Sequence, residues 1–219
     1  MENYKKNLEL LTKNHVYSKE MEHDACGVGL IASTEGKKSR AIVEYGIEAL
    51  KAVWHRGAVD ADGKTGDGAG IHVEIPKDFF IEKIQVTGHD YDNSEICVGM
   101  IFLPRNDYSA QESCKTIVES ELTKNNFSIY GWRQVPVNSK VLGEKALQTM
   151  PEIIQVLFKP NDPNLLDKNL ERKIYEIRKR IENKAFDASL NNFYICSISS
   201  KSIIYKGLYL AESLSDFYL

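Results

Sequence analysis

The sequence predicts an α+β fold in which sheets and helices form separate layers. Several apolar strands follow one another without room for the crossover helices that a parallel, doubly wound sheet requires, so mixed or antiparallel sheets are favoured. The content of 42% hydrophobic and 27% charged residues is typical of a globular protein. The 219 residues are enough for one large domain with a sizeable core.

The first elements follow a polar leader at residues 1–25, where lysines and acidic residues are mixed. Its composition indicates a short helix or a disordered segment. The first apolar strand is predicted at residues 28–31. Apolar residues then recur at helical spacing from Ile42 to Val53, which predicts an amphipathic helix that ends near Trp54.

A long loop is predicted over residues 55–70, which contain five glycines and no hydrophobic periodicity. A loop of this length inside a compact domain is usually functional or disordered. Its glycines allow another backbone or a substrate to approach closely, although a surface turn cluster has the same composition. His55 and His72 are each isolated, so a structural role is favoured for both.

The remaining elements alternate between strands and helices. Prolines end two of the strands, at Pro76 and Pro104, and Asp107 or Ser109 can cap the helix that follows. The predicted strands cover residues 71–75, 96–103, 127–137, 153–158, 193–199 and 203–210, the last two as a hairpin. Three helices are predicted among them. The first begins at residue 107 or 109, the second spans residues 165–186, and the third begins near residue 212.

Charge and hydropathy exclude several classes of partner. A formal net charge of -3 and a pI near 6.0 argue against the basic surface that binds nucleic acid. No apolar run approaches the roughly 18 residues of a membrane span. Residues 1–25 lack the apolar region of a signal peptide, and their acidic residues argue against a transit peptide. We therefore expect a soluble, cytoplasmic protein that binds neither nucleic acid nor membrane.

The four cysteines are widely spaced and form no C-x-x-C pair, which argues against a zinc ribbon or a thioredoxin-like site. Cys97, Cys114 and Cys196 lie in apolar or periodic segments and are predicted to be reduced core residues. Cys26 differs because it follows the small Ala25 and a charged leader, and it opens the first strand.

Cys26 would carry both a thiol nucleophile and an amine base if residues 1–25 were removed. An α-amino group has a pKa of about 7.7–8.0, so part of it is neutral near pH 7 and can accept the thiol proton. The thiolate could then attack a carboxamide and form an acyl-thioester that water hydrolyses. Attack on the Ala25 carbonyl is a route to self-processing. The alternative is an inert buried cysteine.

Three nucleotide- or metal-binding patterns are matched incompletely. The G-x-G-x-x-A pattern at residues 27–32 lies at the start of a strand, whereas a dinucleotide site needs it between a strand and a helix. The P-loop-like residues 57–65 have five residues between the glycines, where four are required. A calcium loop starting at Asp60 would have Thr65 in the glycine position and Ile71 in the glutamate position. None of these sites is expected.

Three stretches of the sequence form a distinctive set: Cys-Gly-Val-Gly at residues 26–29, His-Arg-Gly-Ala-Val at 55–59 and Thr-Gly-Asp-Gly-Ala-Gly-Ile at 65–71. Together they closely resemble the glutamine amidotransferase domain of the glutamate synthase large subunit. Shorter matches follow in the same order, at Pro76 with residues 79–80, at 193–194 and at 205–207. Asp60 and Gly63 replace a glycine and a proline expected from the family.

The resemblance implies the fold of the N-terminal-nucleophile hydrolases, a four-layer αββα sandwich. Residues 1–25 would be a propeptide, and residues 26–219 the N-terminal portion of the domain. Cys26 would hydrolyse glutamine to glutamate and ammonia. The resemblance also implies four residues that support the substrate loop: Arg56, Gly57, Asp67 and Gly68.

In the complete family enzyme, ammonia reaches a distant FMN site and reacts with 2-oxoglutarate. The iminoglutarate is then reduced to glutamate with electrons from an iron–sulfur cluster. The resemblance therefore implies FMN and the cluster for the parent enzyme and no cofactor or metal for this chain. The implied partners are the other large-subunit domains and a small subunit or ferredoxin, and the electron donor stays open.

Two family motifs are missing from the sequence: a His-Ser-Arg-Phe motif that helps hold glutamine, and a His-Asn-Gly-Glu motif whose Asn-Gly forms the oxyanion hole. Loss of one oxyanion donor costs about 10² to 10³ in rate. We therefore expect a fold that is incomplete at the C-terminus and no glutaminase activity from these 219 residues alone. The alternative is a non-catalytic fragment or interaction module of the same fold.

Overall fold

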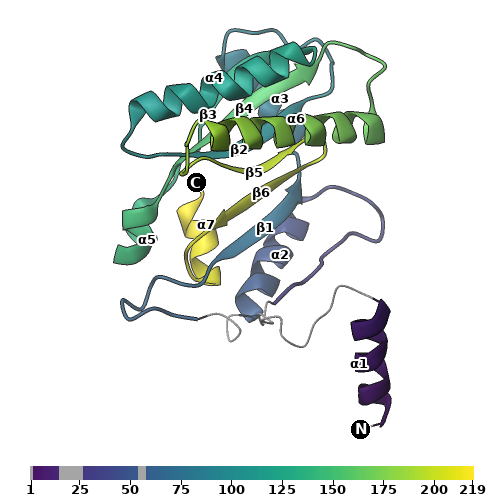
Figure 1. The fold of residues 1–219 in the computed structure, drawn as a ribbon, viewed down its shortest axis with the longest axis vertical. Coiled ribbons are helices and arrows are strands. Elements are labelled where there is room, and N and C mark those ends of the chain that lie inside the picture. The colour runs from purple at the N-terminus through teal and green to yellow at the C-terminus, as the bar shows by residue number, and fades with distance from the viewer. Residues whose placement is uncertain (1, 15–26, 54–57) are drawn as a thin grey trace.

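The computed structural model describes residues 2–14, 27–53 and 58–219, which form an α+β arrangement of layers. From top to bottom, Figure 1 shows two long helices, a four-stranded sheet, a pair of strands and a further helix. The helices of the first layer are α4 (Tyr108–Lys124) and α6 (Asp167–Asp187). The strand pair is β1 (Ala69–Glu74) with β6 (Ser202–Gly207), and the last helix is α2 (Arg40–Ala52).

The four-stranded sheet has the order β3-β4-β2-β5. Its strands are β2 (Cys97–Leu103), β3 (Phe127–Gln134), β4 (Glu152–Pro160) and β5 (Tyr194–Ser199). Every described strand pair, including β1 with β6, is antiparallel, which agrees with the prediction of mixed or antiparallel sheets.

The outer core consists of the buried side chains between the four-stranded sheet and helices α4 and α6. The stripe predicted for α6 is buried there, because residues spaced three or four apart lie on one helix face: Leu170, Ile174, Ile177 and Ile181. Asp107 accepts a hydrogen bond from the Ala110 amide at 2.9 Å, which makes Asp107 the N-cap of α4.

The inner core consists of the buried side chains on the opposite face of the same sheet. It joins the sheet to β6, to Ile47 of α2 and to α3 (Lys77–Val86), whose Phe80 and Ile84 are fully buried. Tyr209 and Phe217 close it near the C-terminus. Among the described residues, no helix is long and apolar enough to cross a membrane.

The predicted strand at residues 28–31 is wrong. Residues 27–33 form no strand, and the side chains of Val28 and Leu30 are 91% and 89% exposed. A strand requires neighbouring backbone groups to pair with its own, and no described strand pairs with this segment. The apolar pattern alone therefore could not produce a strand here.

The predicted hairpin at residues 193–210 is also wrong in its pairing. β5 pairs with β2, whereas β6 pairs with β1, so the turn between them connects two sheets. Side chains hold this turn: the Ser199 hydroxyl oxygen accepts from the Lys201 and Ser202 amides, and the Ser197 hydroxyl oxygen accepts from the Ile204 amide.

Several short elements were not expected from the sequence. They are α3, the 3-10 helix η2 (Ser139–Val141) and α5 (Glu144–Thr149). The helix predicted near residue 212 is confirmed as the 3-10 helix η3 (Ala211–Ser213) followed by α7 (Leu214–Phe217). In the leader, α1 (Glu2–Asn14) is a helix that stands apart from the layers in Figure 1.

Candidate functional site

A cavity of about 670 Å³ lies where β1 begins and β6 ends. Asp67 and Gly68 form part of its wall, immediately before β1. The rest of the wall comes from α5 and the residues beside it, from the end of β2, and from the segment after β6. Apolar side chains predominate, including those of Phe102, Met150 and Ile153, and a mainly apolar wall with few polar groups is typical of a ligand site.

The glycines of the predicted loop allow a close approach of two backbones. A Cβ at Gly66 would lie only 2.7 Å from the carbonyl oxygen of Tyr209, and a Cβ at Gly70 would lie 2.7 Å from the Cβ of Lys206. Gly68 has a φ of +116°, which disfavours a residue with a side chain. These contacts confirm that the glycines admit another backbone, which is the β6 segment.

The turn before these glycines is organised by one carboxylate. Asp62 accepts hydrogen bonds from the Lys64 amide at 2.9 Å, the Thr65 amide at 2.7 Å and the Thr65 hydroxyl at 2.6 Å. The bonds from Thr65 and Lys64 lower the pKa of Asp62 well below its usual value. A backbone bridge between Val59 and Gly66 closes the turn.

The same turn is attached to the start of α5. Lys145 Nζ donates to Asp60 at 2.6 Å, and this hydrogen bond lowers the pKa of Asp60. A Cβ at Gly143, the N-cap of α5, would lie 2.2 Å from Asp62 Oδ2 and 2.6 Å from the Thr65 amide nitrogen. Asp60, which departs from the family pattern, therefore joins the loop to the opposite wall of the cavity.

This close packing predicts that Gly143→Ala destabilises the protein. The new methyl group must displace the Asp62 turn, and forced overpacking typically costs about 1–3 kcal/mol. The free energy of unfolding in urea measures this loss. Gly29→Ala is the matched control, since no atom lies within 4 Å of a Cβ there. Equal stability of the two variants would contradict the packing described.

The three described cysteines are all buried and free, which confirms their predicted place in the core. Burial raises the pKa of Cys114 and of Cys196 to about 11, and it also raises the pKa of Cys97 well above its usual value. These thiols are therefore protonated near neutral pH and are poor nucleophiles. Cys26 lies outside the described residues.

Of the other predicted site residues, Arg56 and Gly57 also lie outside the described residues, so only Asp67 and Gly68 are placed. Two further polar side chains in the cavity wall, those of Lys206 and Tyr194, were missed as site residues. Lys206 Nζ donates a hydrogen bond to the Tyr194 hydroxyl at 2.6 Å. Both belong to short stretches that carry the family resemblance, which was the available signal for them.

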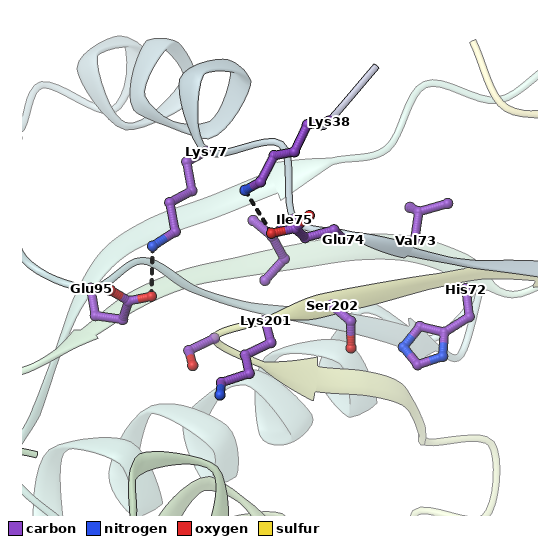
Figure 2. A pocket seen from close by; sticks show the side chains of 10 residues that line it. Lys38, His72, Val73, Glu74, Ile75, Lys77, Glu95, Lys201 and Ser202 are labelled. Carbon is purple, nitrogen blue, oxygen red and sulfur yellow. Dashed lines mark hydrogen bonds and ion pairs between the residues drawn. The ribbon is translucent and has the colours of Figure 1, made fainter. Parts of the chain in front are cut away.

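A second cavity of about 560 Å³ lies at the opposite end of β1, and Figure 2 shows its lining. Its lysines are paired with acidic side chains: Lys38 lies 2.6 Å from Glu74, and Lys77 lies 2.7 Å from Glu95. His72 reaches the wall of both cavities. Because its charges are compensated locally, the second cavity is a weaker candidate site than the first.

No group of three His, Cys, Asp or Glu side chains in the described part of the chain is placed to hold a metal ion. Cys97 and Cys114 belong to the outer core, whereas Cys196 belongs to the inner core on the other face of the sheet. These three thiols therefore do not fit an iron–sulfur cluster, which requires several cysteines at one point.

Comparison with known proteins extends the argument from these residues to a family. The chain is 53% identical over 215 residues to the glutamate synthase [NADPH] large chain of Azospirillum brasilense, covering 98% of this chain and 14% of that protein. It is 39% identical over 200 residues to ferredoxin-dependent glutamate synthase 1 of Arabidopsis thaliana, covering 90% of this chain and 12% of that protein. The chain is also 38% identical over 199 residues to ferredoxin-dependent glutamate synthase 2 of Synechocystis sp., again covering 90% of this chain and 12% of the relative.

The chain thus spans about one eighth of the length of these relatives. The family model that matches it is that of the class-II glutamine amidotransferases, and the match runs from residue 26 to residue 219. The family membership that the sequence motifs indicate is therefore confirmed: the chain belongs to the class-II glutamine amidotransferases.

Proposed function

We propose that this chain is the nucleophile-bearing part of a glutaminase domain in a glutamate synthase. The observation that carries the proposal is that the family match begins at Cys26, the residue that would become the N-terminus after removal of residues 1–25. The buried, protonated state of the three described thiols adds support, because it leaves Cys26 as the candidate nucleophile.

In the proposed reaction, the α-amine of Cys26 accepts the thiol proton and the thiolate attacks the carboxamide of glutamine. Ammonia leaves, and water hydrolyses the acyl-thioester to glutamate. Arg56, Gly57, Asp67 and Gly68 support the loop that faces the substrate. The exposed carboxylate of Asp67 in the cavity wall suits the ammonium group of an amino acid.

The fold and partners belong to the same proposal. The order of layers in Figure 1 agrees with the αββα sandwich of the N-terminal-nucleophile hydrolases. FMN and an iron–sulfur cluster would be bound by other domains of the synthase, where the ammonia is used. A small subunit or ferredoxin would supply electrons to those domains.

The function is tested by assaying glutamate and ammonia released from glutamine. The 219-residue chain is assayed alone and fused to the segment that follows the matched region in the A. brasilense large chain. We expect hydrolysis from the fusion and almost none from the chain alone, because the fusion regains the oxyanion donors. Intact mass should show that the active fusion begins at Cys26.

Two outcomes would contradict the proposal. A fusion that begins at Cys26, is folded and still does not hydrolyse glutamine would favour a non-catalytic interaction module. Full activity in a protein that retains residues 1–25 would exclude the α-amine of Cys26 as the base.

A further inference from the structure

Residues 58–67, which precede β1, form a narrow hairpin that ends in the wall of the first cavity. Its two arms are joined by three backbone contacts: Ala58 with Asp67, Val59 with Gly66, and Asp60 with Thr65. The amide of Asp60 donates to the Thr65 carbonyl oxygen at 2.9 Å, and the amide of Asp67 donates to the Ala58 carbonyl oxygen at 3.3 Å. Because Asp67 lines the cavity, the position of the hairpin affects this part of the wall.

Apolar burial fixes little of the hairpin. Val59 is 49% exposed, and residues 61–64 at the tip are all exposed. Thr65 and Gly66 are buried, but both belong to the arm that leads into β1. A segment with few buried contacts opens more readily than the core of a protein. The position of the tip and of the first arm therefore depends on contacts with a neighbouring element.

Helix α5 provides these contacts and is itself fixed in the protein. Its Ala146 is 3% exposed and belongs to the inner core, and Ala146 and Thr149 line the first cavity. On the exposed side of α5, Lys145 Nζ donates to Asp60 Oδ2 at 2.6 Å. This ion pair, here called the Lys145–Asp60 latch, connects an exposed hairpin to a helix that is anchored in the core.

We propose that Lys145 is a positioning residue that holds the hairpin, and with it Asp67, in place for glutamine through Asp60. The inference rests on the proposed function, because it assigns the first cavity to glutamine. A loop that is already held in its bound position loses less conformational freedom when a ligand binds, so the affinity is higher. Lys145 does not line the cavity, and its effect is therefore expected on substrate binding and not on the chemical step.

The latch is exposed to solvent, which makes its effect dependent on salt. The side chains of Lys145 and Asp60 are 69% and 35% accessible. Exposed ion pairs contribute little to stability and are screened at high ionic strength. The KM for glutamine should therefore rise with sodium chloride in the active fusion protein, and it should rise less in a variant without the latch, whereas the unfolding midpoint should differ little between the two.

Substitutions in the active fusion protein test this role. Lys145→Gln should raise the KM for glutamine about threefold to fivefold, the size of effect that an exposed ion pair can have, and should change the turnover number less than about twofold. Asp60→Asn removes the charge, keeps an acceptor for the Ala61 amide and should have the same effect. The double variant should show no further rise, because both residues act through one contact.

Two further variants separate the latch from a general effect of charge. Lys145→Arg keeps a cation beside Asp60 and should retain the KM of the unchanged fusion. Lys140→Gln is the matched control, since Lys140 is exposed on η2 and forms no ion pair in the part of the chain that the structure describes. It should leave both the KM and its dependence on salt unchanged.

A second measurement needs no enzymatic activity. Lys64 is exposed at the tip of the hairpin, so trypsin can cleave after it when the hairpin opens. Cleavage of a transiently opened segment follows the population of the open form. In the 219-residue chain, Lys145→Gln and Asp60→Asn should each accelerate cleavage after Lys64 about threefold or more, as identified by mass, and Lys140→Gln should not.

The two measurements distinguish failure of the latch from failure of the proposed function. A fusion that does not hydrolyse glutamine would remove the proposed function, and the cleavage rates would still decide whether Lys145 holds the hairpin. Unchanged cleavage after Lys64 in the Lys145→Gln chain would overturn the proposal. An active fusion in which Lys145→Gln leaves the KM unchanged, or lowers only the turnover number, would overturn it as well.

Discussion

Cys26→Ala should abolish glutamine hydrolysis by the active fusion protein, with a loss on the order of 10⁴ to 10⁶ in turnover. The reason is that none of the three thiols that the structure describes can replace it, because Cys97, Cys114 and Cys196 are buried and their pKa values are raised. Glutamate release from glutamine measures the loss. If processing is autocatalytic, intact mass should also show that the variant keeps residues 1–25.

Cys114→Ala is the control for this substitution, because Cys114 lies in the outer core, away from the cavity wall. It should retain activity. Mild alkylation of the folded fusion protein should label Cys26 and leave the three buried thiols unlabelled. A Cys26→Ala protein that still hydrolyses glutamine would remove Cys26 from the mechanism, whereas the family membership of the chain would stand.

Phe158→Ala should cost about 3–5 kcal/mol of the free energy of unfolding. Phe158 on β4 is fully buried in the outer core, where its ring makes an edge contact with Phe127 at a centroid distance of 5.7 Å. Its truncation removes apolar contacts and leaves a cavity that the surrounding side chains cannot fill completely. Denaturation in urea measures the difference.

Phe186→Ala is the matched control, since Phe186 is 78% exposed at the end of α6 and should change stability by less than about 0.5 kcal/mol. The total stability of a domain is about 5–15 kcal/mol, so the Phe158→Ala protein could be largely unfolded. Phe158→Leu, which keeps most of the apolar volume, should then give a smaller, measurable loss. Equal effects at Phe158 and Phe186 would contradict the burial described.

The fold class and most of the long elements were predictable because they depend on local patterns. The apolar stripe of α6 repeats at the helical period, and Asp107 provides the side chain that an N-cap requires. By contrast, α3 has only ten residues and was missed. Its available signal was Pro76 followed by Phe80 and Ile84, which are one helical turn apart.

The candidate site was predictable only in part. The motifs identified Cys26, Arg56, Gly57, Asp67 and Gly68 as candidates, and the structure places the last two in one cavity wall. The ion pair that attaches the loop to α5 joins residues 85 positions apart, from Asp60 to Lys145. No periodicity or local motif encodes such a contact.

Sequence alone determined the chemistry available to this protein: a cysteine after a polar leader, a glycine-rich loop and helices with one apolar face. The tertiary structure decided which strands pair and which groups meet. β5 and β6 adjoin in sequence yet join different sheets, and residues 28–31 pair with no described strand despite their apolar pattern. Arg133 and Gln155 likewise meet only because β3 and β4 are neighbours. Side-chain identity and helical periodicity are local properties, whereas pairing and burial depend on partners distant in the chain.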